Sequence, residues 1–348
     1  MQTRQSPGIG LCLGSVLYGG LWAAPMMFAL PLLPFFALPF AMWMARKGPF
    51  CGALAMLTAL IGMSVFMGPV YALAVGLIAF APAATAWALL RRPSTSPRDG
   101  VLAPAGVMLL CIVAVLGVFY LSLGGGDLVD HLMVWTKQFL LSDASGALEP
   151  MTRTVVLTNR MMEAMLSGPE ALEGLAASVQ AMSPEALADA FVSFLGAQLR
   201  LILPSVLILG SFFGGGLTYY FTLLLQRKKG AVVPRFPRVP DWRMPRGMGT
   251  GLVVMALLGF FGDLFGWAGF DTVAYTTQAL FSTAFGIQGM ATMVWFLKRK
   301  KVPGPLQVLL CILGWTAPML PTLMMLLGIV DETIQLRRIV EYRAKMKF

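Results

Sequence analysis

Histidine, cysteine and charged residues are all scarce in this chain, and each shortage excludes a class of protein. His131 is the only histidine among 348 residues, which excludes HExxH zinc sites and centres built from several imidazoles. The four cysteines stand singly and form no CxxC pair, so we expect small buried side chains rather than a metal or redox centre. Only 12% of residues are charged, whereas about a quarter is typical of water-soluble domains.

Motifs that announce catalysis are also missing. The chain has no GxxxxGK[ST] phosphate loop and no GxSxG nucleophile elbow. Gly247, Gly249 and Gly251 spell GxGxG, but they follow a basic loop instead of a strand, so they do not indicate a dinucleotide site. We therefore expect a protein that is not an enzyme and needs no cofactor.

Apolar residues, in contrast, are abundant. They make up 57% of the chain, and the mean hydropathy is +0.76. Runs of roughly 17 to 25 apolar residues cross a membrane as helices. The sequence thus predicts an all-α, polytopic transmembrane bundle of eight to nine spans. The predicted spans are 8–23, 27–45, 50–67, 69–90, 101–123, 199–226, 248–269 and 276–297, with 304–330 as a ninth candidate.

The region of the first two spans is interrupted by prolines. Pro25, Pro31, Pro34 and Pro39 each remove a backbone donor, so this stretch is either a short hairpin or a broken helix. Because the chain stays apolar after Ala24, we interpret the first span as an uncleaved helix rather than a signal peptide.

Basic residues record the orientation of the chain. They gather after the second, fourth, sixth and eighth spans, so that every second loop is basic. This is the positive-inside pattern of a multi-pass membrane protein with a cytoplasmic N-terminus. The formal charge of +10 is then a consequence of topology, and we predict no specific nucleic-acid partner.

Charge also divides the chain into regions. We predict N-terminal spans over 1–123, an extracytoplasmic insert over 124–198, C-terminal spans over 199–330 with a basic cytoplasmic loop at 227–247, and a basic tail over 331–348. The insert carries nine acids against three bases, as expected of an exported segment.

The last apolar stretch, 304–330, admits two interpretations. A full crossing would place the basic tail outside, against the positive-inside rule. A re-entrant or interfacial element that folds back at Pro318 and Pro321 would keep the tail in the cytoplasm, and we favour this second alternative.

The insert itself has helical patterns. Apolar residues at three- and four-residue spacing predict an amphipathic helix over 126–141. Pro169 and Pro184, each followed by Glu, are typical of helix starts, the second with Ser183 as N-cap. We expect a small helical lid that lies flat on the membrane.

Asp263 is the one acid that the topology does not explain. Gly259, Gly262, Gly266 and Gly269 recur every three or four residues, which predicts a helix face that turns Asp263 into the bundle. A pocket open to the outer side would then be lined by Asp263, Trp267, Gln278 and Gln288. The alternatives are an acid at the membrane edge, and glutamines that hydrogen-bond neighbouring helices.

Glycine pairs predict close contacts between helices. Gly210 and Gly214 in the sixth span, and Gly10 and Gly14 in the first, are spaced as GxxxG. Arg200, at the start of the sixth span, either extends to the outer surface or pairs with the acidic insert. The cluster of Asp127, Asp130 and His131 is interpreted as the solvated face of a helix.

The cytoplasmic loop alternates bases with aromatics and prolines. Its residues are candidates for contact with lipid headgroups or a partner, or serve as orientation charges with an interfacial tryptophan. The candidate contact residues are Arg235, Arg238, Trp242, Arg243 and Arg246.

Three sequence patterns near the C-terminus carry a resemblance. They are the F-x-x-x-x-x-W-R-x-P pattern of the basic loop, Ile287-Gln288-Gly289, and Leu327-Gly328-Ile329-Val330-Asp331 before an arginine-rich tail. In these the chain resembles the YybS-like family of uncharacterised bacterial inner-membrane proteins. That family is distantly similar to the substrate-binding subunits of energy-coupling-factor vitamin transporters and to the cell-shape protein MreD.

The resemblance and the residues together lead to two functional hypotheses. The first is a non-enzymatic component that binds or transports a small molecule. The second is a scaffold for cell-envelope or membrane-protein assembly, with a membrane-protein partner on the insert or the basic loop. The lipid bilayer is the expected environment in both.

Overall fold

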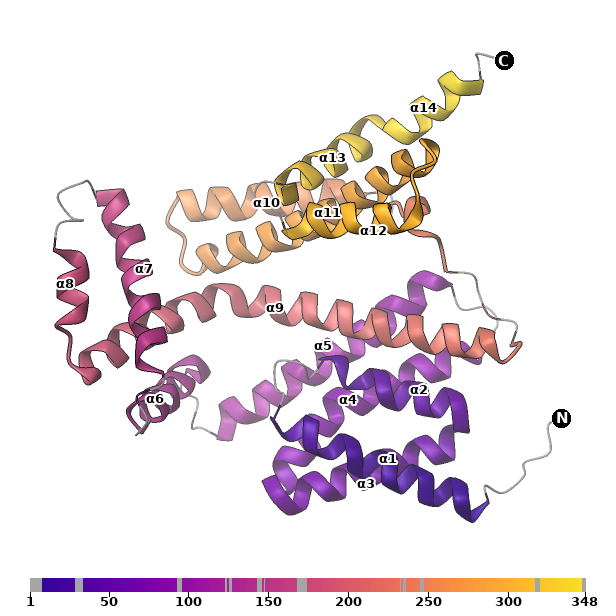
Figure 1. The fold of residues 1–348 in the computed structure, drawn as a ribbon, viewed down its shortest axis with the longest axis horizontal. Coiled ribbons are helices and arrows are strands. Elements are labelled where there is room, and N and C mark those ends of the chain that lie inside the picture. The colour runs from indigo at the N-terminus through magenta and orange to yellow at the C-terminus, as the bar shows by residue number, and fades with distance from the viewer. Residues whose placement is uncertain are drawn as a thin grey trace. The chain divides into compact units, whose positions relative to one another are not determined.

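The computed structural model describes residues 8–28, 34–92, 96–122, 124, 127–142, 146, 148–167, 174–231, 233, 236–244, 247–316 and 320–345. Throughout these residues the chain forms helices and turns, with no strand. The helices are α1 (Ile9–Phe28), α2 (Ala37–Lys47), α3 (Pro49–Met67), α4 (Pro69–Leu90), α5 (Pro97–Ser122), α6 (Leu128–Leu141), α7 (Glu149–Ser167), α8 (Leu175–Gln180), α9 (Pro184–Lys228), the 3₁₀ turn η3 (Val239–Asp241), α10 (Met248–Leu264), α11 (Phe270–Arg299), α12 (Gly304–Thr316), α13 (Leu320–Ile334) and α14 (Leu336–Lys345) (Figure 1). The predicted all-α, polytopic class is confirmed.

Among the described residues, six helices are long and apolar enough to cross a membrane, and a seventh span arises if the bent pair α12–α13 counts as one, fewer than the eight to nine spans predicted. The six are α1, α3, α4, α5, α9 and α11. The second predicted span, 27–45, corresponds instead to α2, whose 11 residues extend about 17 Å. This is shorter than the roughly 30 Å of hydrocarbon. The prolines before α2 explain the difference, because each removes a helix hydrogen bond.

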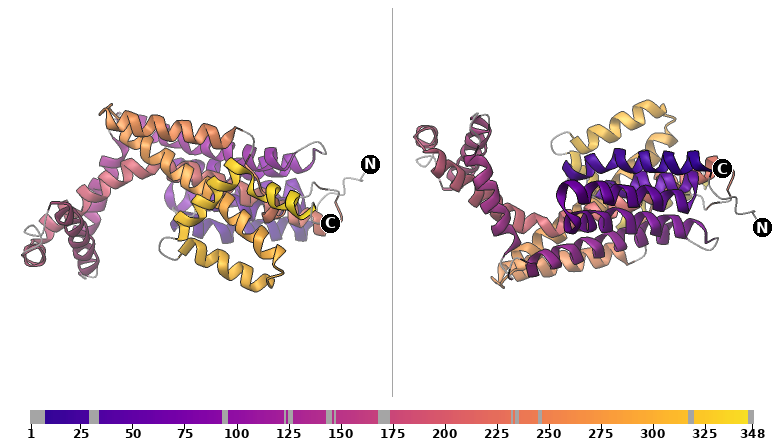
Figure 2. Two further views of the ribbon diagram at one scale, coloured as in Figure 1. Left: turned by 90° about the horizontal axis from the view of Figure 1, so that it is seen from above. Right: turned by 90° about the horizontal axis from the view of Figure 1, so that it is seen from below.

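The chain divides into two compact units, residues 1–115 with 205–348, and residues 116–204. In the first unit, α1 to α4 pack as a small bundle, coloured indigo to purple in the right-hand view of Figure 2. Tyr18 of α1 stacks on Trp43 of α2 at 4.2 Å between ring centroids, and its hydroxyl donates to the Pro39 carbonyl. These contacts join the two helices that the prolines separate.

Small residues allow α9 to approach its neighbours within this unit. A Cβ at Gly214 would lie 2.5 Å from the Pro34 carbonyl oxygen, and one at Gly215 would lie 2.4 Å from the Ala105 nitrogen. The predicted close approach of α9 to another helix is therefore observed at Gly215, against α5, whereas Gly214 meets the turn at Pro34 before α2. The contact predicted at Gly10 and Gly14 is wrong, because both face open space, and Gly19 meets the Ala55 carbonyl instead.

The second unit contains the predicted insert. It holds α6, α7, α8 and the first part of α9, around a core of Val156, Val179 and Leu187. Arg153 of α7 donates to the Val179 carbonyl at 2.7 Å and to Glu149. The helix predicted over 126–141 is present as α6.

The start of α9 also follows the sequence. The Ser183 hydroxyl accepts from the Ala186 amide at 3.2 Å, which is the predicted N-cap. The corresponding start at Pro169 lies outside the described residues. The sequence pattern did not predict that the last helix of the insert and the sixth span form one helix. In the structure α9 is continuous over 45 residues.

The C-terminal helices of the first unit position the candidate site. The hairpin of α10 and α11 packs with α13, and α11 and α13 make the most extensive helix contact in the described chain (Figure 1). A Cβ at Gly289 of α11 would lie 1.7 Å from the Met324 carbonyl oxygen, and one at Gly328 of α13 would lie 2.0 Å from the Phe285 carbonyl oxygen. Two glycines thus bring these helices together backbone to backbone.

The stretch predicted as 304–330 consists of two helices, α12 and α13, whose axes differ in direction by 106°. Residues 317–319, which include Pro318, lie outside the described residues. A change of direction this large fits a chain that folds back better than a straight crossing. The cytoplasmic location of the tail stays a prediction.

Candidate functional site

A buried ion pair lies where α13 meets α14. Asp331 and Arg337 are 5% and 1% exposed. The Arg337 guanidinium donates to Asp331 Oδ2 from Nε at 2.9 Å and from Nη2 at 2.7 Å, and the Arg337 backbone amide donates to Oδ1 at 3.2 Å. A carboxylate held by a guanidinium and an amide can remain charged away from water.

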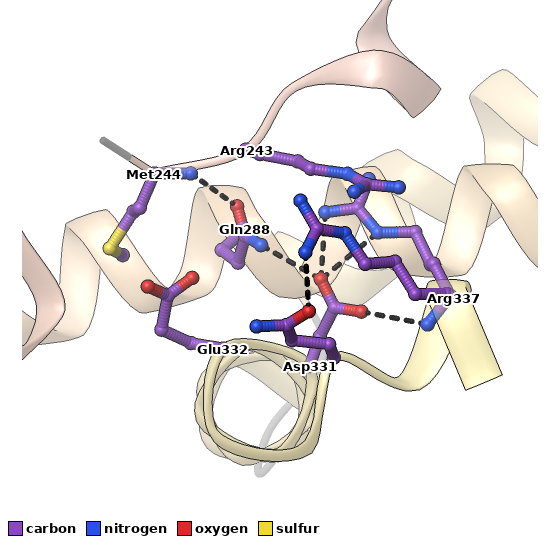
Figure 3. A pocket seen from close by; sticks show the side chains of 8 residues that line it. Arg243, Met244, Gln288, Asp331, Glu332 and Arg337 are labelled. Carbon is purple, nitrogen blue, oxygen red and sulfur yellow. Dashed lines mark hydrogen bonds and ion pairs between the residues drawn. The ribbon is translucent and has the colours of Figure 1, made fainter. Parts of the chain in front are cut away.

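A left-handed residue makes this pair possible. Asp331 and Arg337 stand six positions apart, a spacing that no continuous helix brings onto one face. Gln335, with φ of 51°, ends α13 and starts α14, because its carbonyl accepts from the Arg338 and Ile339 amides. The turn carries Arg337 back over Asp331 (Figure 3).

Gln288 of α11 completes the polar cluster from the neighbouring helix. It is 4% exposed, its Nε2 donates to Asp331 Oδ2 at 2.8 Å, and its Oε1 accepts from the Met244 amide at 3.2 Å. One side chain therefore joins α11, α13 and the basic loop. The alternative in which Gln288 hydrogen-bonds a neighbouring helix is the arrangement observed.

Arg337 also holds the basic loop. Its Nη1 donates to the Pro240 carbonyl at 2.7 Å, and its Nη2 donates to the Trp242 carbonyl at 2.9 Å. Trp242 packs its ring against Phe236 and donates from Nε1 to the Pro237 carbonyl. The guanidinium thus ties α14, α13 and the loop that follows α9 into one structure.

Beside this cluster is a cavity of about 210 Å³. Three of its lining residues are arginines and two are acids (Figure 3). The lining residues are Arg243, Met244, Gln288, Asp331, Glu332, Gln335, Arg337 and Arg338. Because Asp331 is already paired with Arg337, the charges that remain are two guanidiniums and the Glu332 carboxylate.

The two remaining arginines are available for a ligand. Arg338 donates from Nη1 to Gln335 Oε1 at 2.6 Å, and both Arg243 and Arg338 are exposed. In the part of the chain that the structure describes, neither makes an ion pair with a carboxylate. Guanidinium groups bind carboxylate and phosphate oxygens in fixed geometry, so this arrangement suits a small anionic group.

The cavity lining offers little for covalent or metal chemistry. The described residues that line it include no cysteine, histidine or serine. Among the described residues, no group of three or more His, Cys, Asp or Glu side chains could hold a metal ion. Binding by charge and hydrogen bonds is the chemistry that the lining residues can perform.

The four residues predicted to line an outer pocket do not share one environment. Asp263, Trp267 and Gln278 are exposed, and Gln288 is buried in the cluster with Asp331. Asp263 stands one residue before the end of α10, and Trp267 packs on Phe270 at 5.1 Å between ring centroids. The outer pocket itself stays a prediction.

The predicted glycine face around Asp263 is half wrong. Gly259 and Gly262 do lie against α11, where a Cβ would meet Ala274 and Phe270. Gly266 and Gly269 lie outside the helix with φ of 66° and 79°. Gly266 ends α10 because the Trp267 amide donates to the Gly262 carbonyl and the Gly266 amide to the Asp263 carbonyl, the hydrogen bonds of a Schellman cap.

The predicted contact residues of the basic loop have different positions. Arg238 and Arg243 are exposed, and Trp242 is half-buried against Phe236. Arg235 and Arg246 lie outside the described residues. A role of these residues in lipid or partner contact stays a prediction.

Sequence reasoning missed Asp331 and Arg337. Asp331 directly follows an apolar run, and Arg337 is the first base of the basic tail. Both were therefore interpreted as residues at the end of a membrane segment, and neither was considered as part of a site. A signal was present, since an acid in the last turn of an apolar helix needs a partner nearby. Only the turn at Gln335 shows which base supplies it.

Comparisons with known proteins give the family. The family model described as "Predicted membrane protein (DUF2232)" matches residues 23–332, a range that includes Gln288 and Asp331. No curated protein and no solved structure shows a significant match to the chain. These comparisons give no evidence for the predicted YybS-like assignment or for the similarity to vitamin-transporter subunits. With its bundle of apolar helices, the chain belongs to the predicted membrane protein family DUF2232.

Proposed function

We propose that the chain is a non-enzymatic component of a bacterial inner membrane that binds a small anionic molecule in the cavity beside Asp331 and Arg337. The observation that carries this proposal is the pair of exposed guanidiniums, Arg243 and Arg338, at the rim of a polar cavity in an otherwise apolar chain. Under the predicted topology, with the basic loop in the cytoplasm, the cavity opens on the cytoplasmic side.

The buried cluster gives this cavity a fixed shape. Asp331, Arg337 and Gln288 form hydrogen bonds with one another and with carbonyls of the basic loop. These bonds hold the wall of the cavity in place. Three charged lining residues make no ion pair with another described residue, and they come from the loop, the end of α13 and the start of α14: Arg243, Glu332 and Arg338. A preformed positive site costs little reorganisation when an anion binds.

Native mass spectrometry of the gently purified protein tests the proposal. We expect a small-molecule adduct on the wild type that is lost from the double variant Arg243→Ala/Arg338→Ala. The variant Arg92→Ala is the matched control, because Arg92 is also exposed and lies far along the chain from the cavity. An absence of any adduct on the wild type, or equal adducts on all three proteins, would contradict the proposal.

A second measurement uses a defined probe. Inorganic phosphate should raise the thermal stability of the wild type above that in chloride at equal ionic strength, since a ligand that binds only the folded state stabilises it. The increase should vanish in Arg243→Ala/Arg338→Ala and persist in Arg92→Ala. The same increase in both variants would indicate a nonspecific salt effect.

A further inference from the structure

One face of α6 in the insert is apolar and uncovered within its own unit. Leu132, Trp135 and Phe139 are 50%, 77% and 63% exposed. They are spaced by three and four residues, so they form a single stripe along the helix. We name these three residues the α6 apolar face.

The opposite side of α6 is fixed to α9. Val129 and Met133 are buried, and Met133 packs against Gly196, where a Cβ would lie 3.1 Å from its Cγ. Arg200 donates to Asp127 at 2.9 Å and also to Asp130, and Lys137 pairs with Asp189. The helix therefore cannot turn its apolar face toward α9 without breaking several polar contacts.

Asp127, Asp130 and His131 are exposed on α6, as predicted for the solvated face of a helix, and the two acids are in addition paired. Asp127 and Asp130 are partly exposed but both accept hydrogen bonds from Arg200, and His131 contacts the Asp127 carbonyl through Nδ1 at 3.0 Å. Pairing of Arg200 with the acidic insert is the alternative that the structure bears out.

Chain connectivity places α6 at the boundary of the hydrocarbon. The span α5 ends at Ser122, and α6 begins at Leu128, so the connection reaches about 20 Å at most. On its other side α6 contacts α9 at Gly196 and Arg200, immediately before the apolar part of the α9 span begins at Leu201. Both neighbours of α6 thus enter the membrane within a few residues of it.

From these observations we infer that α6 is an interfacial helix whose apolar face inserts into the outer leaflet of the bilayer. Tryptophan and phenylalanine are suited to the boundary between lipid headgroups and acyl chains, where aromatic rings are stable. The α6 acids do not oppose insertion, because both pair with Arg200 on the side of α6 that contacts α9, away from the α6 apolar face. This inference concerns a different unit from the anion cavity and does not depend on it.

Quenching of a fluorescent label tests the inference in the full chain. In a background where Cys12, Cys51, Cys111 and Cys311 are alanine, single cysteines replace Phe139 or Gln138 and carry an environment-sensitive dye. Gln138 is the matched control, since it is also exposed and lies about 100° around the helix. Proteoliposomes contain either a nitroxide lipid or aqueous iodide as quencher.

We expect the label at position 139 to be quenched by the nitroxide lipid, with a several-fold higher ratio of lipid to iodide quenching than at position 138. Equal iodide quenching at both positions would overturn the inference, because the face would then be in water. Protection of position 139 from both quenchers would also overturn it, by showing that protein covers the face. Equal elution of the two labelled proteins from a sizing column verifies that both are folded.

Discussion

At the scale of single residues, the Asp331–Arg337 pair joins more of the chain than any other side-chain contact described. It connects α13, α14, α11 and the loop carbonyls of Pro240 and Trp242. Removal of one partner leaves the other charge buried without compensation. Loss of either partner alone should therefore destabilise the fold, even if replacement of both partners by apolar residues costs little.

The first prediction concerns this pair. Asp331→Asn and Arg337→Gln should each lower the free energy of unfolding by about 3–5 kcal/mol. The double variant Asp331→Asn/Arg337→Gln should lose less than the two single losses together, because no unpaired charge remains. Equilibrium unfolding in mixed micelles, with Arg92→Gln as control, measures the difference; strictly additive losses would contradict the account.

The second prediction separates the two candidate sites. Asp263→Asn should leave the adduct in native mass spectrometry unchanged, because Asp263 is exposed at the end of α10 and does not line the cavity. Loss of the adduct with retained folding would favour the outer pocket predicted from the sequence.

At the scale of elements, the contact between α11 and α13 depends on two glycines. A Cβ at Gly289 would overlap the Met324 carbonyl oxygen, so the helices must separate to accept alanine. Overpacking of this kind costs about 1–3 kcal/mol. Since Gln288 is the neighbour of Gly289, separation would also disturb its hydrogen bond to Asp331.

The third prediction follows. Gly289→Ala should reduce stability and weaken binding of the anion, whereas Gly106→Ala in α5 should do neither, because nothing lies within 4 Å of its Cβ. Thermal unfolding and native mass spectrometry measure both effects. Equal stability of the two variants would show that α11 and α13 do not pack as described.

The fourth prediction concerns α6. The Val129 amide, and then Arg200, lower the pKa of Asp127 below its ordinary value of about 3.9. A lowered folded-state pKa stabilises the protein above the ordinary pKa, and this contribution is lost as the pH falls through the lowered value. Asp127→Asn keeps an N-cap but removes the charge.

The stability difference between wild type and Asp127→Asn should therefore be present at neutral pH and shrink as the pH falls below about 3.9. Thermal unfolding at a series of pH values measures it. A difference that does not change with pH would show that the charge of Asp127 contributes nothing.

At the scale of the whole molecule, composition was enough to predict a polytopic helical chain, because apolar runs and basic loops are properties of the sequence. The candidate site was harder to predict from the sequence. The contact of Gln288 with another helix was among the alternatives. The pairing of Asp331 with Arg337 was not, because it depends on a left-handed turn at Gln335, where the sequence has no glycine to indicate that conformation. The end of α10 was misjudged because Gly266 continues a helical spacing while capping the helix.

The fifth prediction addresses topology. A reporter that is active only in the cytoplasm, fused at Phe348, should be active, because a tail that is rich in arginine and lysine remains on the cytoplasmic side. A silent reporter in a stably expressed fusion would mean that 304–330 crosses fully and that the cavity opens outside.

A density map of the gently purified wild-type protein in a lipid bilayer disc would show directly whether the cavity binds a small anion. Binding of a small anion predicts density in the cavity, in contact with the guanidiniums of Arg243 and Arg338 and beside an intact Asp331–Arg337 pair. A cavity that is closed, or filled with ordered water alone, would contradict it.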